Sequence, residues 1–207
     1  MNDLDHPIFT ESLRRIRLLL GETGLWGLER DVLERLVHSS GDLSLAPDLR
    51  FSPGACELGA CALAAGAPIL TDTAMAAAAV GPMARRTFAN AVQSVLAWAP
   101  EVAPAGGTRA AAGMTTALER HPGAVVLIGS APTALERLLA LTASGAVPLP
   151  ALVIGMPVGF VGVAESKRRL ACSGLPQIRL EGSRGGAALV AAAANALLRG
   201  AWLQPQP

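Results

Sequence analysis

The sequence has few charged residues and no excess of either sign. Lysine and arginine number 17 against 16 aspartate and glutamate residues, so the formal net charge is +1, and charged residues make up 16% of the chain. A nucleic-acid-binding surface needs a strong basic excess, which this composition excludes, although a few local arginines can still bind an anion. Hydrophobic residues reach 51% of 207 residues, so we expect an ordered globular domain with a substantial core.

Cysteine is scarce as well. The three cysteines, Cys56, Cys61 and Cys172, form no Cys-x-x-Cys pair. An odd number without such spacing argues against a disulfide framework and against a zinc site. We therefore expect no metal site, and thiols that stay reduced in the cytoplasm.

Targeting and membrane segments are also missing. Residues 1–6 contain no basic region followed by an apolar one, so we expect no signal peptide. The longest uncharged run lies between Arg137 and Glu165, and several prolines and glycines interrupt it, which argues against a membrane-spanning helix. The Gly-x-Gly-x-x-Gly fingerprint and the Walker phosphate loop are absent, so nucleotide binding has no support.

The most informative stretch that is present runs from Ala151 to Lys167. It begins with a short apolar run suited to a strand buried on both faces. Gly155, Pro157, Gly159 and Gly162 follow and prevent both a helix and a continued strand, and a charged, helix-compatible segment comes next. A strand, a glycine-rich turn and a helix form the typical layout of a ligand site at the carboxyl edge of a parallel sheet.

Four further apolar runs extend this pattern along the chain. We expect strands at residues 68–71, 91–97, 124–128, 151–154 and 177–180, alternating with helices. Thr10 and Thr108 are expected to cap helices, Ser52 and Pro53 to open another, and Gly81-Pro82 to end the helix at residues 74–80. The alternation predicts one α/β domain, residues 1–207, with a five-stranded parallel sheet covered by helices on both faces.

Polar residues follow two of these strands. Asp72 and Thr73 come directly after the strand at residues 68–71, where they can either contact a ligand or cap the next helix. The run Gly129 to Thr133 forms a second strand–glycine–helix junction. Its free backbone N–H groups could hold a carboxylate.

Two candidate functional residues lie at helix ends. His38 sits in the last turn of a helix that Gly41 ends, where the helix dipole favours a protonated imidazole. A histidine of this kind is either a proton donor near neutral pH or a residue that only caps its own helix. Arg109 lies in a first helical turn, where a cation is slightly unfavourable, and such a placement is a hint of function.

Several runs together resemble the precorrin-8X methylmutase family of cobalamin biosynthesis, and they occur in the family's order over nearly the whole chain. The matching runs are Ser12–Arg17, Val37–Gly41, Phe51–Pro53, Ala65–Asp72, Thr108–Ala111, Ile128–Leu135 and, most specific, Gly155–Lys167. The resemblance implies a three-layer α/β/α sandwich and a cytoplasmic homodimer whose active sites are shared between subunits. It implies that no cofactor is needed.

The implied reaction moves a methyl group from C-11 to C-12 in ring C of a corrin precursor and gives hydrogenobyrinic acid. By the resemblance, His38 lies beside ring C and protonates its nitrogen, Ser12 is the site serine and Arg109 the site arginine. A flat macrocycle edged with carboxylates suits arginine donors at its rim and apolar turn residues on its faces. The further substrate contacts that we expect are Arg17, Asp72, Ser130, Gly159, Phe160, Val161 and Arg184.

The sequence departs from the family pattern at several rim positions. Ala77-Ala78-Ala79 stand where the family usually has His-Gly, and Ser130 replaces an asparagine. The arginines that flank a glycine in the family are displaced here, which leaves Glu181 and Ser183 at those positions with Arg184 nearby. Two alternatives therefore stay open beside the methylmutase. One is a tetrapyrrole-binding protein without catalysis, and the other is an isomerase for the cobalt-containing substrate of the anaerobic route.

Overall fold

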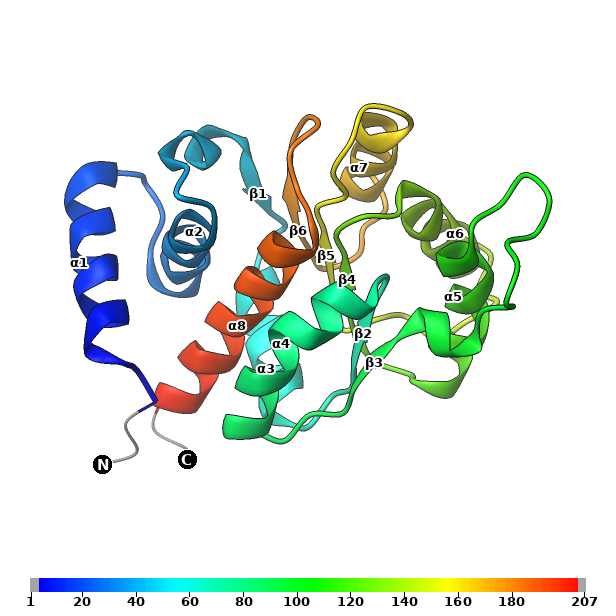
Figure 1. Ribbon diagram of the computed structural model, residues 1–207, viewed down its shortest axis with the longest axis horizontal. Coiled ribbons are helices and arrows are strands. Elements are labelled where there is room, and N and C mark those ends of the chain that lie inside the picture. Colours follow the sequence, from blue (N-terminus) through cyan, green and yellow to red (C-terminus); the bar gives the residue numbers. More distant parts are fainter. Residues whose placement is uncertain (1–3, 205–207) are drawn as a thin grey trace.

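A six-stranded sheet lies at the centre of the computed structural model, which describes residues 4–204 (Figure 1). Neighbouring strands follow the order β1-β6-β5-β4-β2-β3. All pairs are parallel except β1 with β6, which is antiparallel. The strands are β1 (Leu49–Phe51), β2 (Ile69–Thr71), β3 (Val92–Ser94), β4 (Val125–Ile128), β5 (Leu152–Gly155) and β6 (Gln177–Leu180).

Helices cover both faces of this sheet. One face is covered by α2 (Gly27–Ser40), α3 (Ala55–Ala64), α4 (Ala74–Arg86) and α8 (Ala187–Leu203), and the other by α5 (Arg109–Arg120), α6 (Pro132–Ala143) and α7 (Val163–Ala171). Helix α1 (Pro7–Leu20) packs on the outside of α2 (Figure 1). The strands alternate accordingly: Leu127 belongs to the first core cluster, whereas Val126 and Ile128 belong to the second. Consecutive side chains of a strand point to opposite faces, so the three central strands, β2, β4 and β5, contribute to both clusters.

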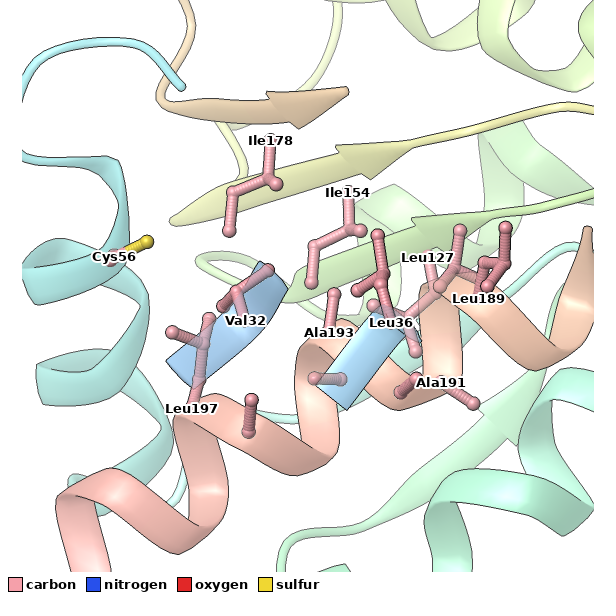
Figure 2. Close-up of a cluster of buried hydrophobic side chains, with 14 of the residues drawn as sticks. Val32, Leu36, Cys56, Leu127, Ile154, Ile178, Leu189, Ala191, Ala193 and Leu197 are labelled. Carbon is pink, nitrogen blue, oxygen red and sulfur yellow. The ribbon is translucent and has the colours of Figure 1, made fainter. Parts of the chain in front are cut away.

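The larger cluster joins α2, α8 and the middle strands. Figure 2 shows Val32 of α2 beside Leu197 of α8 and Leu36 of α2 near Ala193, beneath Ile154 and Ile178 of the sheet. The middle of α8 is largely alanine, and its residues from Leu189 to Leu198 are all buried. Alanine side chains are small, so α8 can approach both the sheet and α2 closely.

The prediction of a five-stranded parallel sheet is wrong in one respect: a sixth strand, β1, makes the sheet mixed. Leu49 pairs with Leu180 and Phe51 with Ile178. Three residues give too short an alternation to be recognised from sequence. Ser52, expected to cap a helix, instead accepts a hydrogen bond from the backbone N–H of Gln177 at 2.9 Å, and α3 begins later, at Ala55.

Three other boundaries differ from those predicted. Helix α1 begins at Pro7 with His6 as its capping residue rather than Thr10. Helix α4 continues through Pro82 to Arg86, and tertiary packing on both sides of the proline, at Val80 and Ala84, holds it against the core despite the missing hydrogen bond. Strand β3 ends at Ser94, where the short helix η2 (Val95–Trp98) begins. The other predicted strands are confirmed to within one or two residues.

The carboxyl edge of the sheet gathers the segments expected to function. The turns that follow β2, β4, β5 and β6 all leave the sheet there, because these strands are parallel. Strand β1 runs the other way, so its first residue lies beside the end of β6. The short helix η1 (Leu43–Asp48) and the end of α2 are therefore brought to the same edge. Among residues 4–204, no helix is both long and apolar enough to cross a membrane.

Candidate functional site

His38 is held from two sides by helix α1. The hydroxyl oxygen of Ser12 lies 2.8 Å from Nδ1 of His38. Phe9, one turn earlier on the same face of α1, meets the imidazole edge-on with ring centroids 5.1 Å apart. Gly41 ends α2 in the left-handed conformation, and its own N–H bonds the carbonyl of Val37. The hydrogen bond found for the imidazole therefore goes to another helix and does not cap α2.

The surroundings of His38 favour its neutral form. Burial lowers the pKa of His38, and the charge of the nearby Arg35 lowers it further. This direction is opposite to the shift that a helix C-terminus alone predicts. The guanidinium of Arg35 stacks over the Phe9 ring at 4.4 Å, so Arg35, Phe9 and His38 form one column of contacts. With Ser12 bonded to Nδ1, the other ring nitrogen, Nε2, can still donate or accept a further hydrogen bond.

A groove of about 570 Å³ opens along α1 next to this pair. Ser12 contributes to its wall, and the other lining residues are Pro7, Ile8, Glu11, Arg15 and Ile16. Arg17 points elsewhere: its Nε donates to both oxygens of Glu34 at 2.8 and 2.9 Å. The Glu34 side chain is fully buried and also accepts a hydrogen bond from Arg30. Arg17 and Arg30 therefore neutralise a buried carboxylate.

Asp72 and Ser130 meet at the turns that follow β2 and β4. The Asp72 carboxylate accepts hydrogen bonds from the backbone N–H groups of Ser130 at 2.7 Å and Ala131 at 2.8 Å. Burial raises the pKa of Asp72, and these N–H groups oppose that rise. The N–H groups expected to be free for a substrate carboxylate are thus occupied by the protein's own carboxylate, which corrects that prediction. The cap of α4 comes from Thr73, whose hydroxyl accepts from Ala76.

The glycine-rich turn after β5 presents apolar side chains to solvent. Phe160 is 94% exposed and Val161 87% exposed. Gly159 adopts a φ of 134°, which side-chain-bearing residues rarely tolerate, and its N–H donates to the carbonyl of Ser183. Val158 donates to the carbonyl of Gly129, so the turn also joins the β4 exit. Exposed apolar groups on a fixed turn suit the face of a flat ligand.

The two remaining arginines expected in the site are bound within the protein. Arg184 donates to Asp42, Ser44 and Asp48, which lie at the end of α2 and in η1. Arg109 donates from Nε to the carbonyl of Pro100 at 2.8 Å, at the amino end of α5. Helix α5 covers the face opposite to α2, so Arg109 and His38 lie on different sides of the sheet.

Several residues that contact His38 or Arg184 were not predicted from the sequence. Phe9 and Arg35 touch the His38 environment, and each lies one helical turn from a predicted site residue, a spacing that could have indicated them. Asp42 and Asp48, the partners of Arg184, are about 140 residues away from it in the chain, and no local signal joins them. Among residues 4–204 no group of three or more histidine, cysteine or acidic residues is arranged to hold a metal ion.

Comparisons with known proteins agree with this architecture. A family model described as Precorrin-8X methylmutase matches residues 7–200. This chain belongs to the precorrin-8X methylmutase family. Members of this family are isomerases of cobalamin biosynthesis that catalyse a methyl migration, and the chain is such an isomerase.

The relatives carry two different names. The chain is 45% identical over 200 residues to a Precorrin-8X methylmutase of Pseudomonas aeruginosa, covering 92% of this chain and 93% of the relative. It is 39% identical to a Cobalt-precorrin-8 methylmutase of a Synechocystis species, covering 98% of this chain and 99% of that one. A solved precorrin-8x methyl mutase from Thermus thermophilus superposes with a TM-score of 0.86 at 43% identity, covering 95% and 98%.

Proposed function

We propose that this methylmutase acts on precorrin-8X and moves the methyl group from C-11 to C-12 of ring C, giving hydrogenobyrinic acid. His38 is the proton donor to the ring C nitrogen. The observation that carries this proposal is the hydrogen bond between Ser12 and Nδ1 of His38, which orients the imidazole and leaves Nε2 for the substrate. Ser12 supports the proton donor in this scheme and lines the adjoining groove.

The charge of the bound substrate favours the protonation of His38 that the proposed reaction needs. Arg35 and burial keep the imidazole mainly neutral in the free protein. A macrocycle edged with carboxylates brings negative charge beside His38 and raises its pKa, so the cationic donor forms when the substrate is bound. General acid catalysis by one positioned group typically raises a reaction rate by about 10²–10⁴-fold. We assign this contribution to His38.

The remaining site residues are assigned to binding. Phe160 and Val161, on the turn fixed by Gly159, contact the apolar face of the ring, and Arg109 contacts a rim carboxylate. Asp72 shapes the exits of β2 and β4 through the amides at Ser130. We further propose that the enzyme needs no cofactor, works in the cytoplasm, and is a homodimer whose subunits share each active site.

The test is a visible-spectrum time course of the purified protein with precorrin-8X. Conversion to the hydrogenobyrinic acid spectrum is expected, because isomerisation changes the chromophore. Replacement His38→Ala should lower turnover by about 10²-fold or more, since it removes the proton donor. The matched control is His121→Ala, which changes a histidine at the far end of α5 and should leave turnover unchanged. An active His38→Ala enzyme contradicts the assignment.

The alternative of tetrapyrrole binding without isomerisation is set aside by the family membership, which makes the chain an isomerase. The amides of Ser130 and Ala131, occupied by Asp72, remove one expected carboxylate contact but do not touch the isomerisation itself. A parallel assay with cobalt-precorrin-8 tests the substrate named for the Synechocystis relative; faster conversion of the cobalt-containing ring reassigns the substrate while keeping the reaction.

A further inference from the structure

Arg184 directs both terminal nitrogens of its guanidinium group to one short segment of the chain. Nη1 donates to Asp42 Oδ2 at 3.2 Å and to the Ser44 hydroxyl at 2.7 Å. Nη2 donates to the Ser44 carbonyl at 2.9 Å and to the Asp48 carboxylate. These four bonds use the four N–H groups of the two Nη atoms, and only Nε–H remains. Two-pronged binding of a substrate carboxylate needs two donors, so Arg184 as it stands is poorly suited to that role.

The segment that Arg184 binds begins immediately after the last turn of α2, which carries His38. Asp42 is four residues beyond His38 and caps η1 through Ser44, while Asp48 ends η1 just before β1. The hydroxyl and backbone N–H of Ser44 lower the pKa of Asp42, with a smaller effect from Arg184, so Asp42 is ionised at neutral pH. The end of α2 that carries His38 is therefore attached to Arg184 by charge-assisted hydrogen bonds.

The backbone around Arg184 is fixed from the opposite side by Lys167. Nζ of Lys167 donates to the carbonyls of Gly182 at 2.9 Å and Arg184 at 2.6 Å. Lys167 is only 1% exposed and belongs to α7, the helix that follows the glycine-rich turn. The turn between β6 and α8 is thus held between the segment that follows α2 and the middle of α7.

The same turn also contacts the glycine-rich segment directly. The N–H of Gly159 donates to Ser183, and the N–H of Gly186 donates to the carbonyl of Met156. Gly185 lies so close that an added Cβ would be 1.9 Å from the Met156 carbonyl oxygen. The β6–α8 turn is therefore joined by backbone hydrogen bonds and close packing to the turn that presents Phe160 and Val161.

We infer that Arg184 is a positioning residue that sets the distance between His38 and the apolar turn at residues 158–162. It acts through Asp42 and Asp48 and does not touch the substrate. This inference rests on the proposed function, in which His38 and Phe160 act on one ring. A displacement of about 1 Å in such a site can cost about 10²-fold in rate, so the contribution of Arg184 falls on the chemical step.

The experiment compares Arg184→Gln, Asp48→Asn and the double variant in steady-state turnover of precorrin-8X. We expect kcat to fall about tenfold or more with KM changed less than about twofold, because the proton donor is displaced while the ring is still bound. Asp48→Asn should show the same pattern, and the double variant no further loss. The matched control is Arg168→Gln, which changes an exposed arginine that pairs with Glu165 and should behave as wild type.

A rise in KM at unchanged kcat in Arg184→Gln, with Asp48→Asn normal, would show a direct substrate contact and overturn the inference. Additive losses in the double variant would also overturn it. Arg184→Lys keeps the charge but cannot reach both carboxylates at once, and we expect an intermediate kcat. This conservative variant keeps the test valid where Arg184→Gln unfolds.

Amide hydrogen exchange separates this inference from the proposed function. Arg184→Gln should speed exchange at the amides of Gly41 and Gly159, which border the two sides of the connection, and leave the amides of β4 protected. If wild type does not convert precorrin-8X, the proposed function fails, while exchange still tests the connection. Unchanged exchange at both glycines contradicts the inference whatever the enzyme does.

Discussion

His38 illustrates at the residue scale how neighbours set the chemistry of one side chain. Its place in the last turn of α2 and within the Val37–Gly41 run was predictable from sequence. Its bond to Ser12 was not, because the two residues come from separate helices 26 positions apart. Asp72 is similar: its position after β2 follows from the pattern, but its bonds to amides 58 and 59 residues away depend on the sheet order.

Removing the Arg35 charge should raise the pKa of His38. Burial is the larger cause of its lowered pKa, and Arg35 is the second. Arg35→Gln keeps a polar side chain beside Phe9 but removes the positive charge that opposes protonation. The measurement is an NMR titration of the His38 imidazole signals in wild type and in Arg35→Gln. An unchanged His38 titration contradicts this account of its environment.

The same shift has a consequence for stability. The folded-state pKa of His38 lies below the unfolded value of about 6.5. The unfolded chain therefore binds the proton first, and this group lowers the free energy of unfolding as pH falls from about 6.5 to the folded pKa. Arg35→Gln brings the folded pKa of His38 closer to its unfolded value and so narrows the pH range over which stability is lost. The urea midpoint of the variant should therefore fall less than that of wild type between pH 7 and pH 5.

At the scale of elements, the glycine-rich turns were predictable and the contacts between them were not. The strand, turn and helix expected at residues 151–167 are confirmed as β5 and α7. The short strand β1 was missed, and α4 continues past the expected stop at Gly81-Pro82. In both places tertiary packing decided the outcome against a local rule: β1 is defined by its pairing with β6, and the end of α4 by burial of Ala84.

Close backbone approach at Gly185 makes a test of this packing. An added Cβ would lie 1.9 Å from the carbonyl oxygen of Met156, and a backbone atom cannot swing aside. Gly185→Ala should reduce the free energy of unfolding by about 2 kcal/mol or more, measured by urea denaturation. Gly107→Ala is the control, because its Cβ would meet the nearest atom at 3.6 Å. Equal stability of the two variants would contradict the close contact.

Lys167 offers a second test at this scale, since it is the only lysine and the chain contains no tyrosine. Burial lowers the pKa of Lys167 to about 8, whereas the unfolded value is about 10.4. The unfolded chain holds the proton longer, so this group makes the free energy of unfolding rise from about pH 8 to about pH 10.4. Lys167→Met should lack that rise, and should also be less stable at pH 7, because two carbonyls lose their donor. If the free energy of unfolding changed with pH in the same way in wild type and in Lys167→Met, the pKa of Lys167 would not be lowered.

At the scale of the whole molecule, composition and alternation were enough to predict an α/β sheet with helices on both faces. The antiparallel edge strand was not predictable from them, yet it matters, because it brings η1 and the end of α2 to the carboxyl edge. The structure also separates two predicted site residues: His38 belongs to the helices on one face and Arg109 to those on the other. A proposed site that uses both residues is then easier to build from two subunits than from one.

Subunit mixing tests that arrangement. His38→Ala and Arg109→Ala are each expected to be inactive as pure proteins, the first through the proton donor and the second through a rim contact. If each site takes His38 from one subunit and Arg109 from the other, a mixed dimer has one site with both defects and one intact site. Co-expression in equal amounts with random pairing should therefore restore about a quarter of wild-type turnover, because half of the dimers are mixed and each has one working site.

The outcome without sharing is different. If one subunit supplies both residues, every site in the mixed dimer carries one defect, and co-expression restores nothing. Co-expression of two differently tagged copies of His38→Ala gives the turnover that recombination and tags alone produce. In the main experiment, purification through both tags isolates the mixed dimer. A monomeric protein in light scattering at assay concentration rules out sharing directly, and His38 and Arg109 must then act from opposite faces of one chain. Recovery in the doubly tagged dimer would assign the two residues of each site to two subunits.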